Sequence, residues 1–349
     1  GEDGQIKGGP VYYITTAFKG GFGKFLAGFF AIAIILALGF FGCMVQSNSI
    51  GETFSNAFNV PTWIIGVVLV AICGFIFLGG VQRLASVTEK VVPIMAAIFL
   101  LGGLIVLIVR IKYVPATFGM IFKYAFAPQA IIGGGFGYAL KTAISQGAKR
   151  GLFSNEAGMG SAPNVAASAD VTHPVKQGLI QTLGVFTDTL VICTCTAFII
   201  LFSGVASTKE ANGIKLTQMA LNNEIGNIGT IYVAVAILFF AYSSILGNYY
   251  YGEANVRYIT HRKWAIPIYR IAVGGMVMFG ALASLELAWS LADMAMGFMT
   301  ICNLIAITLL GKYAFRLLED YRIQKRNGVK NPVFTKDRMK DIENDLECW

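Results

Sequence analysis

The sequence predicts an all-α polytopic membrane protein, and three observations support this prediction. Of the 349 residues, 56% are hydrophobic and only 13% are charged, and the mean hydropathy is +0.65. Apolar runs of roughly 20 residues, the length needed to cross a bilayer as a helix, recur along the chain. The Lys and Arg residues collect in alternate connections between these runs. A composition this apolar excludes a soluble domain.

The apolar runs define eight predicted transmembrane helices. They lie at about 25–55, 62–80, 91–109, 129–147, 177–203, 230–256, 266–283 and 287–310. The amphipathic stretch 113–127 is too short to span and is expected at the outer interface. These positions predict an N-terminal segment at 1–24, a transmembrane domain at 25–311 and a polar tail at 312–349.

The basic residues predict the sidedness of the chain. Twenty of the 27 Lys and Arg residues fall on one side of the eight spans and five on the other, with Lys141 and Arg270 inside spans. The positive-inside rule then places both ends of this chain in the cytoplasm, for a protein of a prokaryotic-type plasma membrane. The net charge of +8 is therefore assigned to topology, and no nucleic-acid partner is expected. The chain begins at Gly1 without Met, so further helices upstream are expected.

The first predicted span is longer than a perpendicular crossing requires. It is expected to run tilted and to end before the turn at 58–61. Its polar cluster, Gln46, Ser47, Asn48 and Ser49, would lie well inside the protein. Polar side chains at that depth either bond a neighbouring helix or face a substrate. The spacing alone leaves both readings open.

The fourth predicted span contains Gly133, Gly134, Gly135 and Gly137, where an uninterrupted helix would avoid glycine. Unwound backbone at membrane depth persists only where protein or a watery cavity surrounds it. Such a break therefore predicts a site for an ion or a polar solute. Close packing of two helices at the glycines is the alternative.

Two later spans carry polar atoms near mid-depth. Asp188 lies about eleven residues into its helix, where a carboxylate is expensive unless it is paired or bound to a cation. It is either a functional residue or an acid satisfied by neighbouring hydroxyls or by Lys141. Ser243 and Ser244 are either ion ligands or, as serines of membrane helices usually are, bonded to their own i−4 carbonyl.

No enzyme motif withstands inspection. GGGFG at 133–137 lacks the GKS/T ending of a phosphate loop and a preceding strand. His173 and His261 are the only histidines, and both fall in polar connections, which argues against histidine-based catalysis. Neither a catalytic residue nor a cofactor is predicted.

Residues 151–163, GLFSNEAGMGSAP, closely resemble the signature of the alanine or glycine:cation symporter family, sodium-coupled amino-acid carriers of the APC superfamily. Similar blocks follow the family's order: GGPVYYI, FGCMVQSNSI, LGGVQRLASVTEKVVP, FTDTLVICT, FAYSSILG and YYGE. The resemblance implies a LeuT-type fold of two inverted five-helix repeats. The eight spans would be core helices three to ten, without the glycine-rich broken helix that family members carry upstream of GGPxYYI.

The resemblance implies a symporter that imports a small neutral amino acid of the alanine or glycine class with sodium by alternating access. The implied partners are the amino acid, the sodium ion and the lipid bilayer, with sodium as the only metal. Two alternatives remain: a membrane protein that binds or senses amino acids without transport, and an inactive fragment of the symporter.

The resemblance also implies roles for single residues. A second broken helix at 131–142 and the pair Gln46 and Asn48 would face the substrate; the expected contacts of the broken helix are Gly134, Gly135, Phe136 and Gly137. Ser243 and Ser244 match a hydroxyl pair that ligates sodium, and oxygen ligands suit this hard cation.

Three further residues are implied as gate or ion-linked positions, and one as part of the pocket. Asp188 matches a family position without an assigned role, and Asn155 and Glu156 lie in the signature, expected on the cytoplasmic side of the break. Asn248 stands where family members often have Trp. If it borders the pocket, the cavity is larger and more polar, which favours glutamine or serine over alanine or glycine.

Overall fold

A computed structural model describes residues 7–125, 136–205 and 212–342 of the chain. These residues form helices and connections, and none of them belongs to a β-strand. Within the described ranges, six helices are long and apolar enough to cross a membrane, and they are Gly21–Phe58, Gln82–Val109, Pro174–Ser203, Asn227–Ile259, Ala265–Leu282 and Leu285–Arg326. The predicted all-helical, polytopic membrane architecture is therefore confirmed.

The first span is one continuous rod with a π-helical middle. Helix α1 (Pro10–Ala17) precedes it, and the rod consists of α2 (Gly21–Ile34), the π-helix η1 (Ile35–Gly42) and α3 (Cys43–Phe58). It ends where the sequence predicts, because Asn59 adopts a left-handed φ of 54° and Pro61 cannot continue a helix. Helix α4 (Thr62–Leu78) then runs back along α3.

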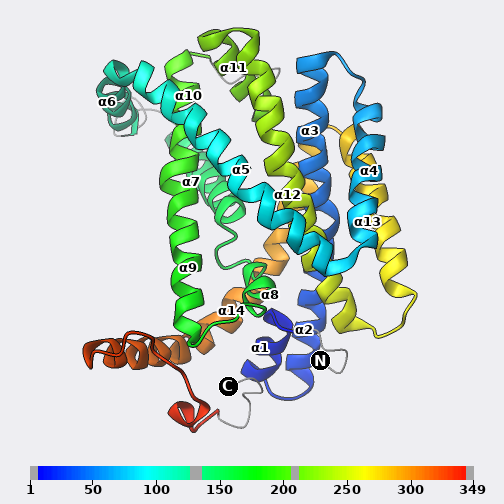
Figure 1. The fold of residues 1–349 in the computed structure, drawn as a ribbon, viewed down its shortest axis with the longest axis vertical. Coiled ribbons are helices and arrows are strands. Elements are labelled where there is room, and N and C mark those ends of the chain that lie inside the picture. Colours follow the sequence, from blue (N-terminus) through cyan, green and yellow to red (C-terminus); the bar gives the residue numbers. More distant parts are fainter. Residues whose placement is uncertain (1–6, 126–135, 206–211, 343–349) are drawn as a thin grey trace.

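The middle of the chain forms the left part of the molecule in Figure 1, and α5 crosses the front of the bundle. Its elements are α5 (Gly80–Val109), η2 (Ile111–Tyr113), α6 (Val114–Ala125), α7 (Phe136–Asn155), α8 (Ala162–Ala166), α9 (Pro174–Thr187), the π-helix η4 (Asp188–Cys193), α10 (Thr194–Ser203) and α11 (Gly213–Ile225). Helix α6 occupies the segment expected at the interface, and it lies at the edge of the bundle.

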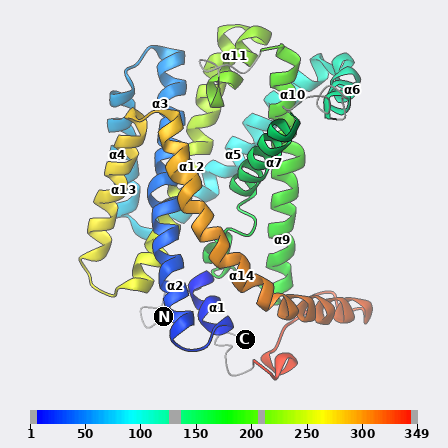
Figure 2. The same ribbon diagram turned by 180° about the vertical axis from the view of Figure 1, so that it is seen from behind.

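The last part of the chain returns through the bundle. It consists of α12 (Asn227–Ile259), α13 (Ala265–Leu282), α14 (Leu285–Arg326) and η5 (Lys336–Met339). Helix α14 continues past the predicted end of its span at residue 310, so the tail begins as helix. In Figure 2, which shows the molecule from behind, α14 crosses the bundle and its last part turns outward.

Two of the eight predicted spans are not among the six. Helix α4 is apolar but has only 17 residues, the lower limit for a crossing. The span predicted at 129–147 lies partly outside the described residues, and helix α7 carries Lys141, Lys149 and Arg150. Its basic side chains make α7 less apolar than the other long helices.

The core has two large parts: one joins α1, α2 and η1 to α14, and the other lies where α3 packs against α4, α12 and α13. Small residues allow close approach there. An added Cβ at Gly280 of α13 would lie 2.4 Å from the carbonyl oxygen of Met44 and 2.3 Å from the Ser47 hydroxyl. The backbones of α3 and α13 therefore approach as closely as small-residue interfaces of membrane helices allow.

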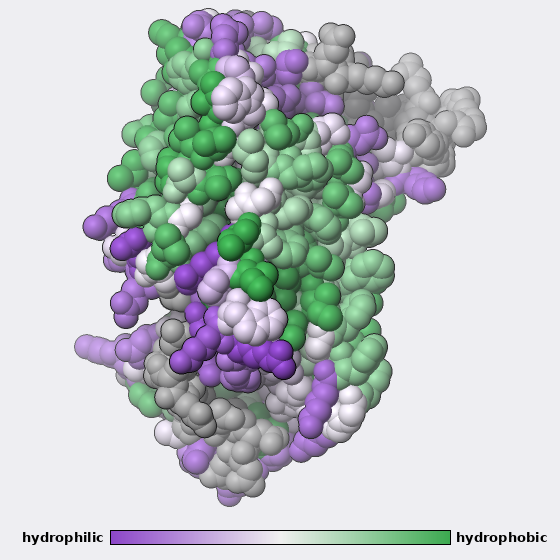
Figure 3. All heavy atoms as spheres, turned by 90° about the vertical axis from the view of Figure 1, so that its right-hand side faces the viewer, coloured by the Kyte–Doolittle hydropathy of each residue, from purple (hydrophilic) through white to green (hydrophobic). Residues whose placement is uncertain are grey.

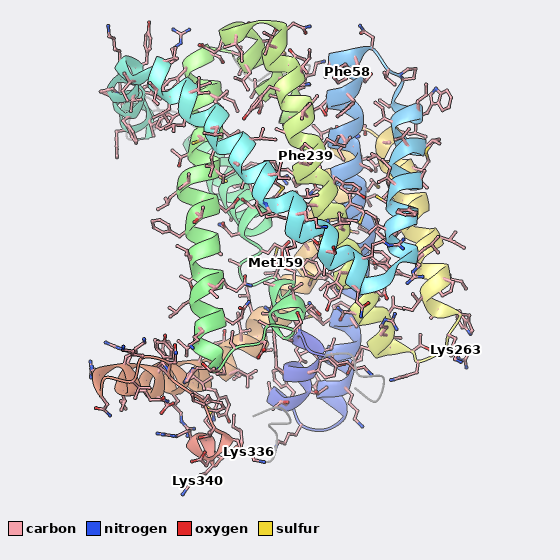
Figure 4. All side chains as sticks on the ribbon, viewed as in Figure 1. Phe58, Met159, Phe239, Lys263, Lys336 and Lys340 are labelled. Atoms are coloured by element: carbon pink, nitrogen blue, oxygen red, sulfur yellow. The ribbon has the colours of Figure 1, made fainter. Side chains whose placement is uncertain are left out.

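The two ends of the bundle differ in character. The end that holds the α3–α4 turn, here called the α3–α4 end, carries Phe58 and α11, whereas Lys263, Lys336 and Lys340 lie at the opposite end, here called the tail end (Figure 4). The side with α4 and α13 presents an apolar band between more polar zones (Figure 3). This arrangement is that of a protein embedded in a bilayer.

Candidate functional site

A non-helical turn at residues 156–161 follows α7 and lies inside the bundle. Glu156, Gly158 and Gly160 all have positive φ, of 51°, 80° and 91°. Met159 is buried, with 1% of its surface exposed, and Figure 4 places it between the surrounding helices. A Cβ at Gly160 would lie 2.9 Å from the Phe30 ring, so glycine is required there for both conformation and space.

The structure covers the break predicted at 131–142 only in part, and it shows a second interruption at 156–161. Residues 131–135 lie outside the described residues, but 136–142 are helical and begin α7. Gly137 falls in the first turn of that helix, where one glycine is tolerated. The described helix ends later, because the sequence EAGMGS supplies glycines at the positions that take left-handed backbone. Within the signature 151–163, Met159, Gly160 and Ser161 are buried in the bundle, whereas Gly151, Ser154 and Ala157 are exposed.

The Glu156 carboxylate accepts one hydrogen bond from within this turn and one from α12. Its Oε2 atom accepts a hydrogen bond from the Ser161 hydroxyl at 2.5 Å and one from the Tyr251 hydroxyl at 3.3 Å. Glu156 lies outside the six candidate spans. Burial raises the pKa of its carboxyl, and the two donated bonds lower that pKa in part. Glu156 therefore takes up a proton more readily than an exposed glutamate.

Two asparagines bond the backbone of the turn, and a third asparagine bonds the side chain of one of them. Asn303 of α14 donates to the Gly158 carbonyl at 2.8 Å and accepts a hydrogen bond from the Tyr13 hydroxyl of α1. Asn164 of α8 donates to the carbonyls of Gly160 and Ser161 at 3.0 and 2.9 Å. Asn255 of α12 donates to Asn164 Oδ1 at 3.2 Å. The turn therefore joins α1, α8, α12 and α14.

Helix α7 is anchored to α14 just before the turn. The Arg150 guanidinium lies 3.1 Å from the Asp293 carboxylate and 3.9 Å from the centre of the Trp289 ring. The Phe153 ring packs edge-on against the same Trp289 ring at 4.7 Å. These contacts fix the end of α7, and with it the start of the turn.

The predicted gate residues lie around the end of α7. Asn155 Oδ1 accepts a hydrogen bond from the Thr189 hydroxyl at 2.7 Å, and the Ser154 hydroxyl donates to Asp188. Asp188 is the first residue of the π-helix η4, and η4 contacts α7. The structure thus joins the end of α7 to η4 through Asn155 and Asp188, whereas the Glu156 side chain bonds Ser161 and Tyr251 instead. A hydroxyl satisfies Asp188, as one of the two sequence readings expected.

The two predicted substrate-facing residues of α3, Gln46 and Asn48, lie on different faces of the helix. Asn48 is buried and donates through Nδ2 to the carbonyls of Gly280 and Ala283 at 3.1 and 2.7 Å. Gln46 is half-buried two residues earlier, and residues i and i+2 do not share a helix face. The two side chains therefore do not line one surface.

The predicted sodium and pocket residues of α12 are buried or half-buried. The hydroxyls of Ser243 and Ser244 each donate to the Phe240 carbonyl at 2.9 Å, which leaves their oxygen lone pairs to accept or ligate. Asn248 lies against η1, and its Nδ2 atom is 2.7 Å from where a Cβ on Gly42 would stand. Of the predicted broken-helix contacts, Gly134 and Gly135 lie outside the described residues, and only the backbone of Phe136 and Gly137 is described.

Sequence reasoning missed most partners of the turn. Tyr13, Tyr251, Asn255 and Asn303 are single polar residues on helices far from residue 156 in the chain. One signal was available, since asparagines within apolar runs at 230–256 and 287–310 require a partner at membrane depth.

Comparison with known proteins gives a consistent result. A profile of the sodium:alanine symporter family matches residues 1–336. The chain is 46% identical to the probable sodium/glutamine symporter GlnT of Bacillus subtilis, over 99% of this chain and 70% of that protein. It is 45% identical to the amino-acid carrier protein AlsT of the same organism, over 100% and 72%. It is 37% identical to the sodium/alanine symporter AgcS of Methanococcus maripaludis, over 95% and 72%.

Proposed function

Because the chain belongs to the sodium:alanine symporter family, we propose that it is a sodium-coupled symporter that imports a small neutral amino acid by alternating access. The match of the family profile over residues 1–336 is the observation that carries this proposal. Sodium and the amino acid would bind the same conformations, so that each raises the affinity for the other and the sodium gradient drives uptake. The role is transport, without catalysis and without a cofactor other than the carried ion.

The proposed architecture is the LeuT-type inverted repeat, in which the six candidate spans together with α4 and α7 would be core helices three to ten. The inverted repeat relates core helices three, four and five to core helices eight, nine and ten. A contact made by a helix of one repeat should therefore have a counterpart in the other repeat. Helix α3 packs on α4 as α12 packs on α13, and α5 packs on α12 as α14 packs on α3. These paired contacts support the proposal, and the tail end would face the cytoplasm of a prokaryotic-type plasma membrane.

The proposed binding site combines the interrupted helix with α3 and α12. Non-helical backbone next to a helix end offers polar groups to the amino and carboxyl groups of an amino acid. The substrate contacts remain Gln46, Asn48, Asn248 and residues 134–137, and the sodium ligands remain Ser243 and Ser244. Asn155, Glu156 and Asp188 would form a gate, since they join α7 to η4 and α12.

Asn248 bears on the choice of amino acid. It is buried where α12 meets η1, so an amide there would add a hydrogen-bonding group to the pocket. A site with a buried polar group discriminates against substrates that leave the group unpaired. We therefore expect glutamine or serine to compete with alanine and glycine, and GlnT, named a probable sodium/glutamine symporter, is consistent with this expectation.

The test is uptake by the protein expressed from its natural gene and reconstituted in vesicles. An inward sodium gradient should accumulate labelled alanine, glycine, serine or glutamine, and potassium in place of sodium should abolish accumulation at the same pH gradient. Equal uptake in potassium would refute sodium coupling. Binding without uptake would favour the non-transporting alternative.

Two variants test the assigned roles in the same assay. Gln46→Ala should raise the amino-acid concentration needed for half-maximal uptake, because it removes a substrate contact. Ser244→Ala should chiefly raise the sodium concentration needed, because it removes an ion ligand. Ser168→Ala is the control, since Ser168 is exposed and bonds only within its own turn. Unchanged values for both test variants would remove these residues from the site.

A further inference from the structure

The α3–α4 end contains a cavity with an oxygen-rich lining. Its volume is about 290 Å³, and it lies between α3, the start of α4 and the turn that joins α13 to α14. Asn48, Glu52, Ser55 and Thr62 contribute side-chain oxygens. Ser243, Ser244 and the 156–161 turn do not line it. The cavity is therefore separate from the proposed sodium ligands, but it shares Asn48 with the proposed substrate contacts.

The orientation of the Asn48 amide is fixed by α13. Its Nδ2 atom donates to the carbonyls of Gly280 and Ala283, so the nitrogen must face the end of α13. Only 6% of Asn48 is exposed, and its Oδ1 atom is buried without a hydrogen-bond partner among the described residues. A buried acceptor of this kind costs free energy unless something binds it.

Glu52 follows Asn48 by one helical turn, so both side chains lie on the same face of α3. Its Oε2 atom is also buried without a hydrogen-bond partner in the described part of the chain. None of the ion pairs among the described residues includes Glu52, although Lys215 of α11 acts on it electrostatically. The same cavity thus holds two unsatisfied acceptor oxygens, one of them on a carboxylate.

We propose that this cavity binds a monovalent cation, with Asn48 Oδ1 and the Glu52 carboxylate as ligands. Oxygen atoms are the ligands that hard cations prefer, and the carboxylate supplies the negative charge. One carboxylate balances one positive charge. The cation is either inorganic sodium or the ammonium group of an amino acid, because both offer the same charge to the same oxygens.

The test measures the melting temperature of the purified protein against cation concentration. The background carries Ser243→Ala and Ser244→Ala, which removes the proposed central sodium ligands, and N-methyl-D-glucamine keeps the ionic strength constant. Sodium chloride is the probe in one arm and methylammonium chloride in the other. A bound cation raises the melting temperature of the folded state.

In this background, Glu52→Gln should raise the cation concentration that gives half of the melting-temperature shift about tenfold or more. This is the effect expected when a bound cation loses its charged partner. Glu286→Gln is the matched control, because Glu286 is exposed near the start of α14 and does not line the cavity. Glu52→Asp keeps the charge and should retain binding, and the melting temperature without either probe shows that each variant folds.

A Glu52-dependent response to sodium alone identifies an ion site, and an equal response to methylammonium identifies an ammonium site. The proposal is overturned if neither probe acts, or if Glu52→Gln responds as the background does. Uptake in vesicles is measured separately. Loss of the transport proposal would therefore leave the cavity result unaffected, and the reverse also holds.

Discussion

At the scale of single residues, asparagines hold the turn at 156–161 that follows α7. Asn303 bonds both Gly158, 145 positions away, and Tyr13, 290 positions away. No local pattern in a single sequence carries such pairings, because the partners share neither a helix face nor a turn. The sequence singled out Glu156 through its place in the signature, but the hydroxyl of Tyr251 that binds it was visible only in the fold.

Asn303→Ala should destabilise the protein by about 1–3 kcal/mol, because it leaves the Gly158 carbonyl and the Tyr13 hydroxyl with an unmade bond. Thermal unfolding in detergent measures the effect. Thr308→Val is the control on the same helix, since Thr308 is bonded only to the Leu304 carbonyl one turn away. Equal melting temperatures for Asn303→Ala and the control would show that the asparagine does not support the turn.

At the scale of elements, the ends of helices were more predictable than their interruptions. Pro61 marked the end of the first span, and α3 ends at Phe58. The glycines at 133–137 predicted a break by composition, and most of that stretch lies outside the described residues. The turn at Glu156, which ends α7, was not predicted by the glycine pattern. A glycine tolerates many conformations, so its presence does not reveal which one the surrounding helices impose. The π-helices η1 and η4 also have no signal in the hydrophobic pattern.

Gly280→Ala should separate α3 from α13, because the added Cβ would meet the Met44 carbonyl at 2.4 Å. Overpacking of this kind costs about 1–3 kcal/mol, which a lower melting temperature should report. Gly275→Ala on the same helix is the control. No atom lies within 4 Å of a Cβ placed there, so this change should be neutral or slightly stabilising. A neutral result at Gly280 would mean that the two backbones can move apart without cost.

At the scale of the whole molecule, the count of basic residues predicts orientation, and the fold places those residues consistently. Lys263, Lys336 and Lys340 share the tail end, and Phe58 lies at the other (Figure 4). With the natural cysteines replaced, Lys263→Cys should react with an impermeant maleimide only in inverted vesicles. Phe58→Cys should react only in intact cells. The opposite pattern would reverse the proposed orientation.

The tail returns to the bundle at a buried histidine. The Phe334 amide donates to the Thr172 carbonyl at 2.9 Å, and His173 is enclosed by the rings of Tyr321 and Phe334. Because His173 Nδ1 accepts the Val175 amide, its Nε2 atom carries the proton and faces Asp320 at 3.4 Å. The polar composition of the tail predicts that it lies in solvent, and no pattern in the tail indicates this contact.

Burial lowers the pKa of His173, and Asp320 opposes that shift in part. A lowered pKa in the folded state means that the tail contact is fully stable above the ordinary histidine pKa of about 6.5 and weakens as pH falls through the lower folded value. Hydrogen exchange at the Phe334 amide, corrected for the intrinsic rate, should therefore accelerate on acidification. Arg338 and Lys176 are other charged side chains at this contact, where Arg338 pairs with Asp320 and Lys176 donates to the Thr172 hydroxyl.

His173→Gln should remove this pH dependence, and His261→Gln, at an exposed position, should preserve it. Persistence of the dependence in His173→Gln would assign it to another group.

The bond between Tyr13 and Asn303 also has a consequence for biosynthesis. At roughly 5–20 residues per second, a ribosome needs about 15–60 s to add the 290 residues that separate them. During that interval α1 and the 156–161 turn are made, and the turn waits for its partner on α14 while the polypeptide is still being inserted. A nascent chain stalled before residue 303 would therefore expose polar groups without hydrogen-bond partners to the quality-control machinery for membrane proteins.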